Sequence, residues 1–243
     1  GAAGFSAGLG DRDVAGGGPI GSLWGVGKGQ RARSVVYVVD RSGSFVDWVE
    51  AIDIELKRSL GLLQEDQSFN IVFLRDNAPL IFRPRMIPAD LAAKREAFAW
   101  INLHPPAGGS DLTPAVREAL KHQPEILFIV TDYALLSSPV QATDLPALID
   151  TIRDANRRGH MTVNVILMGP FARPEGNAES LRRRLKDAAG TLAPQQVSLM
   201  REQLELLETL EAIERLPRST GGTLQYLNGD ELMERLRASR PAP

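Results

Sequence analysis

The sequence predicts an α/β protein with a doubly wound, mostly parallel central sheet, one antiparallel edge strand and helices on both faces. Two apolar runs, residues 34–39 and 125–131, show no polar alternation, which is typical of strands covered on both faces. After the first run, apolar residues recur at steps of three and four over residues 49–63, the pattern of a helix with one buried stripe. Strands that alternate with helices favour a parallel sheet.

The remaining elements follow in chain order. Residues 69–74 and 80–82 are predicted to be strands joined by a tight turn at Asp76 and Asn77, which gives an antiparallel hairpin. A helix is expected to begin at Pro88 and to end near Trp100. The other expected elements are helices at 112–120, 144–158, 177–186 and 194–216, strands at 161–168 and 223–227, and a last helix capped by Asp230.

Composition excludes several classes of protein. The chain has 243 residues, and 28 Lys and Arg against 30 Asp and Glu give a formal net charge of −2. Proteins that bind nucleic-acid phosphates or anionic membranes usually carry a basic excess, so neither partner is expected. The absence of Cys excludes disulfides and thiolate chemistry. No apolar run reaches the roughly 18 residues of a membrane span, and the compartment is left open.

We predict three parts along the chain: a Gly-rich N-terminal arm at 1–33, a domain at 34–238 and a C-terminal tail at 239–243. Of the 22 glycines, 11 fall in the first 30 residues, where regular structure is entropically costly. The arm is either a tether or an extra edge strand. Within the domain, a helical insertion at about 177–216 either packs on its own sheet or docks a second chain.

Polar side chains gather where two predicted strands end. Asp40 follows the first buried strand and Asp132 follows strand 125–131, and in open parallel sheets ligands bind beyond such carboxyl ends. Ser42 and Ser44 add two hydroxyls next to Asp40, and a glycine-rich loop adds Ser110. These are all oxygen ligands, which favour Mg²⁺, Mn²⁺ or Ca²⁺ over zinc or copper.

Three segments together resemble the von Willebrand factor type A domain. They are Asp40-x-Ser42-x-Ser44, the sequence GGSDL at 108–112 and the sequence FIVTD at 128–132, in the family's order. The resemblance covers about residues 33–237, including a Thr-Gly-Gly turn at 220–222 similar to one common in bacterial members. It implies a Rossmann-like fold and a metal-ion-dependent adhesion site.

Carried over position by position, the resemblance implies recognition without catalysis. The two serines of the first motif would bind the cation directly, the two aspartates would bind it directly or through water, and a partner protein's Asp or Glu carboxylate would fill an open position. The implied cation is Mg²⁺, with Mn²⁺ or Ca²⁺ as alternatives, and the implied ligands are Asp40, Ser42, Ser44, Ser110 and Asp132.

Some positions depart from the family pattern. Ser110 stands where threonine is usual, and Thr113 is the alternative ligand if the loop register differs. Tyr133 follows Asp132 where glycine is frequent, and it would either crowd the metal or contact a partner. Phe45 stands where methionine is common. A degenerate site on a metal-independent interaction scaffold is therefore a second interpretation.

An enzyme is the rival class. Asp40 beside Mg²⁺ fits the phosphoryl acceptor of a phosphohydrolase-like protein, but Ser42 stands where a second acid is normally needed. The glycines around Lys28 precede a strand instead of following one, and no Ser or Thr follows Lys28, which argues against a phosphate-binding loop. We therefore predict a binding protein and no catalytic residues.

Overall fold

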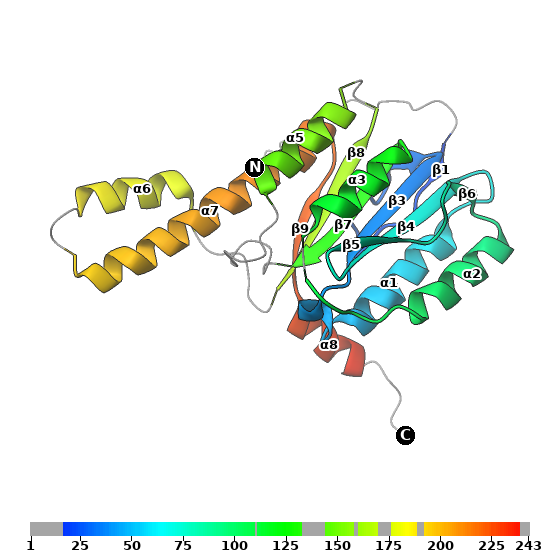
Figure 1. Ribbon diagram of the computed structural model, residues 1–243, viewed down its shortest axis with the longest axis horizontal. Coiled ribbons are helices and arrows are strands. Elements are labelled where there is room, and N and C mark those ends of the chain that lie inside the picture. Colours follow the sequence, from blue (N-terminus) through cyan, green and yellow to red (C-terminus); the bar gives the residue numbers. More distant parts are fainter. Residues whose placement is uncertain are drawn as a thin grey trace, which may run out of the picture.

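In the computed structural model, a seven-stranded sheet runs in the order β5-β4-β3-β7-β8-β9, and β6 pairs with β4 (Figure 1). The structure describes residues 17–109, 111–132, 144–157, 160–169, 176–188 and 192–238. Neighbours among β4, β3, β7, β8 and β9 are parallel, whereas β5 and β6 are antiparallel to β4. This topology confirms the predicted fold class. The strands are β3 Ser34–Asp40, β4 Ser68–Arg75, β5 Ala78–Ile81, β6 Ile87–Pro88, β7 Ile126–Asp132, β8 Thr162–Gly169 and β9 Leu224–Asn228.

Helices cover both faces of the sheet because alternate residues of its central strands point to opposite sides. In β3, Tyr37 joins the core beneath one helical layer and Val38 joins the core beneath the other. The first layer holds α1 Val49–Leu62, α2 Leu91–Asn102 and α8 Gly229–Ala238, and the second holds α3 Thr113–Lys121, α5 Leu145–Ala155 and part of α7 Pro194–Thr220 (Figure 1).

The two halves of helix α7 pack against different parts of the protein. Its C-terminal half buries Leu210, Ile213 and Leu216 in the second core, whereas its N-terminal half runs beside α6 Ala178–Asp187 away from the sheet (Figure 1). It continues four residues beyond the predicted end and stops at Gly221, whose φ of 75° gives a left-handed C-terminal cap. Among the described helices, none is both long and apolar enough to cross a membrane.

The described N-terminal segment, residues 17–33, packs against the first helical layer. Two short strands, β1 Gly18–Pro19 and β2 Arg31–Ala32, pair with each other in a separate sheet. Leu23 is buried in the first core, and Gln67 Nε2 donates to the carbonyl oxygens of Gly18 (3.0 Å) and Ala32 (2.6 Å). The segment therefore pairs with itself and adds no strand to the main sheet.

The prediction that a helix begins at Pro88 is wrong. Pro88 lies in β6 at the edge of the sheet, where the missing N–H of proline is tolerated. Helix α2 begins at Leu91 because the Asp90 carboxylate accepts a hydrogen bond from the Ala93 backbone N–H at 2.7 Å, which caps the helix.

The prediction that Asp230 caps the last helix is also wrong. Asn228 Oδ1 accepts from the backbone N–H groups of Asp230 (3.1 Å) and Glu231 (3.2 Å), so the cap lies two residues earlier. The Asp230 carboxylate accepts from the indole Nε1 of Trp48 at 3.0 Å. This contact ties α8 to the segment that precedes α1.

Candidate metal centre

The candidate centre lies at the switch point of the sheet. β3 neighbours β4 on one side and β7 on the other, so chain order reverses between β3 and β7, where α/β proteins bind ligands. Parallel pairing sets Val39 opposite Val130 and brings the strand ends together. The chain therefore places Asp40 and Asp132, both buried, at the same edge of the sheet.

Asp40 is held through both of its carboxylate oxygens. Oδ1 accepts from the Ser42 backbone N–H at 2.7 Å, and Oδ2 accepts from the Thr131 hydroxyl at 3.1 Å. The side chain is 0% exposed. Burial, and less strongly the nearby Asp132 charge, raise the pKa of Asp40 to about 7, against the lowering effect of the Ser42 and Thr131 hydrogen bonds. A cation at this edge would offset that unfavourable burial of charge.

The loop after β3 turns so that its two serine hydroxyls face each other. Ser42 Oγ and Ser44 Oγ lie 2.9 Å apart, with Ser42 buried and Ser44 exposed. The turn is a short 3₁₀ helix, Gly43–Phe45, anchored by the buried Phe45 ring against Trp48, with the ring centroids 5.9 Å apart. One protected and one accessible hydroxyl therefore stand side by side.

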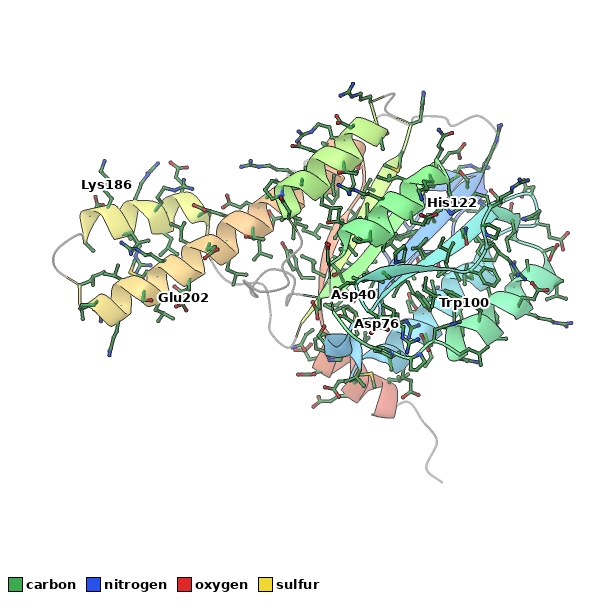
Figure 2. The ribbon with its side chains drawn as sticks, viewed as in Figure 1. Asp40, Asp76, Trp100, His122, Lys186 and Glu202 are labelled. Atoms are coloured by element: carbon green, nitrogen blue, oxygen red, sulfur yellow. The ribbon has the colours of Figure 1, made fainter. Side chains whose placement is uncertain are left out.

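The glycine-rich loop is bonded to the loop after β3. The Gly43 backbone N–H donates to the Gly108 carbonyl (3.1 Å), and the Ala107 N–H donates to the Arg41 carbonyl (2.7 Å). The β4–β5 turn joins them through Asp76, whose N–H donates to the Ala107 carbonyl (3.1 Å). Figure 2 shows Asp40 and Asp76 at this edge of the sheet. Three loops distant in sequence thus form one bonded unit.

The start of α3 belongs to the same unit. Asn77 Oδ1 accepts from the Asp111 N–H (3.1 Å), and Asp111 Oδ1 accepts from the Thr113 N–H (3.0 Å). Asp76 and Asn77 have φ values of 55° and 58°, the positive values that a tight hairpin turn requires, which confirms the predicted turn.

Of the five predicted ligands, Asp40, Ser42, Ser44 and Asp132 lie at this edge. Ser110 lies outside the described residues, as does Tyr133. Sequence reasoning missed Thr131, because its role follows from its position opposite the end of β3, which depends on strand register. Within the described ranges, no group of three or more His, Cys, Asp or Glu side chains is arranged to hold a metal. A cation held here by the described residues would need oxygen ligands in addition to the two carboxylates, such as the serine hydroxyls.

The described donors fit a hard divalent cation. Carboxylate and hydroxyl oxygens are the ligands that Mg²⁺ and Ca²⁺ prefer. Arg41 follows Asp40 in sequence, but its guanidinium forms an ion pair with Asp53 and lies 4.3 Å above the Phe73 ring. The Arg41 guanidinium thus pairs with Asp53 and not with the Asp40 carboxylate.

Comparisons with known proteins bear on the fold. A scan of protein-family models finds no match, and neither does a search of curated proteins. Among solved structures, a von Willebrand factor type A protein from Catenulispora acidiphila matches with a TM-score of 0.53 and 15% sequence identity. The match covers 85% of this chain and 41% of that chain, so this chain spans about two fifths of that protein. The chain has the von Willebrand factor type A fold.

Proposed function

We propose that this chain is a divalent-cation-dependent protein-binding domain. The cation would be held by Asp40, Ser42, Ser44, Ser110 and Asp132 and would accept an Asp or Glu carboxylate from a partner protein. The observation that carries this proposal is the pair of serine hydroxyls 2.9 Å apart beside the buried strand-end carboxylate of Asp40. Mg²⁺, Mn²⁺ and Ca²⁺ are the cations that suit such ligands.

The residues of the site would have different roles in binding the cation and in admitting a partner. Asp40 is oriented by Ser42 and Thr131, so its carboxylate is fixed before a cation arrives. The two serine hydroxyls are neutral ligands, and a bound cation would supply the positive charge that attracts a partner carboxylate. Ser44 is exposed, so the partner can approach from its side of the loop.

An exposed apolar side chain follows Ser44 in the same loop. Val46 is 58% exposed, although it lies only two residues after Ser44. A carboxylate alone gives little discrimination among partners, whereas an adjoining apolar contact adds shape and buried area. The partner segment is therefore expected to carry an Asp or Glu with an apolar neighbour.

The geometry favours binding over phosphoryl transfer. An aspartate that attacks phosphorus needs an oxygen free to reach the substrate. Asp40 has no exposed surface, and both of its oxygens already accept hydrogen bonds. A buried carboxylate of this kind suits a cation ligand on the protein side of the site.

A thermal-shift titration tests the cation. Saturating Mg²⁺, Mn²⁺ or Ca²⁺ at 100 times the dissociation constant should stabilise the wild type by about 2.7 kcal/mol. Asp40→Asn and Ser44→Ala should weaken that shift, and Ser198→Ala, an exposed serine on α7, should leave it unchanged. A wild type that responds to none of the three ions at millimolar concentration rejects the metal site and leaves the metal-independent scaffold.

A second measurement tests the carboxylate. Immobilised protein is offered a peptide library with central Asp or Glu and variable neighbours, and a matched library with Asn or Gln. Capture should require both the acid and the cation, and chelation should abolish it. Equal capture of the acid and amide libraries would show that no partner carboxylate is recognised.

A further inference from the structure

A helical hairpin projects from the body of the protein. It comprises α6 and the N-terminal half of α7, and we name residues 178–188 and 192–207 the distal hairpin (Figure 1). Its apolar cluster is separate from the two cores beneath the sheet. Among the described residues it buries Ala178, Leu181 and Leu207, with Met200 and Leu204 partly buried against them. Helices of this length are marginal in water without further packing. The distal hairpin therefore has little apolar burial for an element so far from the sheet.

A groove opens between the C-terminal end of α6 and the N-terminal part of α7. It has a volume of about 390 Å³ and is open to solvent. Its sides are partly apolar and partly charged. Leu199, the neighbour of Met200 in sequence, is 58% exposed. The residues that line the groove are Arg184, Asp187, Ala188, Leu192 and Met200.

The two charged residues of the groove differ from their neighbours on α6. Arg182 pairs with Glu208 of α7, and Arg183 pairs with Glu179. Within the part of the chain that the structure describes, the side chains of Arg184 and Asp187 form neither an ion pair nor a hydrogen bond, although they stand three residues apart on one helix. The groove therefore presents one unpaired positive and one unpaired negative charge.

We propose that a second copy of this chain docks on the distal hairpin about a two-fold axis, so that two hairpins form a four-helix bundle. In such an interface each contact occurs twice, and Arg184 of each copy meets Asp187 of the other. A purely acidic or purely basic partner would satisfy one of the two charges and repel the other. A second copy satisfies both, and it covers Leu199 and the apolar lining of the groove.

The size of the hairpin sets the strength of this association. Two helices side by side are about 20 Å wide, and the ten residues of α6 are about 15 Å long. A face of these dimensions, about 300 Å² per copy, is well below the roughly 800 Å² per copy of a standard interface and fits only a weak, transient contact. The dimer should therefore form and dissociate with protein concentration, and it should not depend on a metal ion.

Sedimentation equilibrium of the full chain in chelator tests the proposal, over about two orders of magnitude in concentration. The weight-average mass of the wild type should rise from 26.5 kDa towards twice that value. Arg184→Asp and Asp187→Arg should each hold the protein near the monomer mass, because like charges then meet. The doubly substituted R184D/D187R chain should recover the dimer, because the pairs are restored in reverse.

Two further variants sharpen the result. Leu199→Glu places a charge on the apolar part of the face and should also give a monomer. Lys186→Asp makes the same charge change as Arg184→Asp, but Lys186 lies on the side of α6 away from α7 (Figure 2), so its dimer should persist. Circular dichroism confirms that each variant keeps its helices, since all four side chains are exposed.

Several outcomes would overturn the proposal. A wild type that stays at the monomer mass over the whole range has no such interface. A dimer that survives both single charge substitutions uses another surface. Failure of the double substitution to restore a dimer lost in the singles would show that Arg184 and Asp187 do not face each other across a two-fold axis.

Discussion

Arg41 and Asp53 form an ion pair beside the loop that carries the candidate ligands Ser42 and Ser44. The Arg41 side chain is 1% exposed and lies over the Phe73 ring. Its Nε and Nη1 atoms are buried and have no hydrogen-bond partner among the residues that the structure describes. Asp53 is thus the one carboxylate that compensates this guanidinium in the described residues. The pair links the loop after β3 to α1.

We expect the two ways of removing this pair to differ strongly. Asp53→Ala leaves a buried, uncompensated guanidinium and should lower the free energy of unfolding by about 3–5 kcal/mol. R41M/D53L replaces both charges by apolar groups and should cost less than the single change, although it removes more polar atoms. Urea unfolding of the three proteins measures both differences. If the single and the double variant lost the same free energy of unfolding, the uncompensated charge of Arg41 would not be the cause of the loss.

Gly108 is expected to tolerate no side chain. Its φ is 74°, and a Cβ there would lie 2.5 Å from the Asp76 Cα, which is backbone and cannot move aside cheaply. Gly108→Ala should therefore cost more than the roughly 1–2 kcal/mol of left-handed strain alone and should weaken the cation-induced thermal shift.

Gly61 supplies the matched control for this substitution. It lies in α1, and an added Cβ would meet nothing within 4 Å. Gly61→Ala should stabilise the protein by about 0.5–1 kcal/mol because alanine favours helix. Thermal unfolding of both variants decides the matter, and a harmless Gly108→Ala would show that the glycine loop can shift away from Asp76.

His122 should make stability depend on pH. Asn70 Nδ2 lies 3.1 Å from its Nε2, and burial lowers the pKa of His122, with Lys121 adding to this effect and Glu118 opposing it. In the unfolded chain, His122 has its ordinary pKa of about 6.5 and therefore binds a proton more readily than in the folded protein. The contribution of neutral His122 to the free energy of unfolding is therefore complete above about pH 6.5 and is lost as the pH falls.

The comparison that isolates this effect uses His122→Gln, which keeps a hydrogen-bond acceptor for Asn70. Between about pH 7.5 and about pH 5.5, the wild type should lose more unfolding free energy than the variant. Denaturant titrations at the two pH values give the difference. Parallel losses in both proteins would assign the pH dependence to other groups.

Local patterns were enough to predict the sheet and the two strand-end aspartates. The apolar runs that end at Asp40 and Asp132 carry their own signal, because strands buried on both faces need no polar alternation. Four predicted ligands lie at one edge for that reason: parallel strands bring their carboxyl ends to the same side. The tight turn at Asp76 and Asn77 was likewise readable from its residue types.

Features that depend on contacts between distant segments were missed. Thr131 bonds Asp40 only because the register of β3 and β7 sets them side by side. The strand at Pro88 exists because β4 offers a free edge there, and Asp230 bonds Trp48, 182 residues away in sequence. Helix and strand periodicity contains no information about such pairings.

Helix α7 is a continuous link between the distal hairpin and the second core. It is 27 residues long, or about 40 Å, and no loop interrupts it between the distal hairpin and the second core. Its C-terminal half is clamped by Leu210, Ile213 and Leu216 against the sheet. Because the helix is continuous and its C-terminal half is packed against the sheet, a force applied to the distal hairpin would be transmitted to the second core.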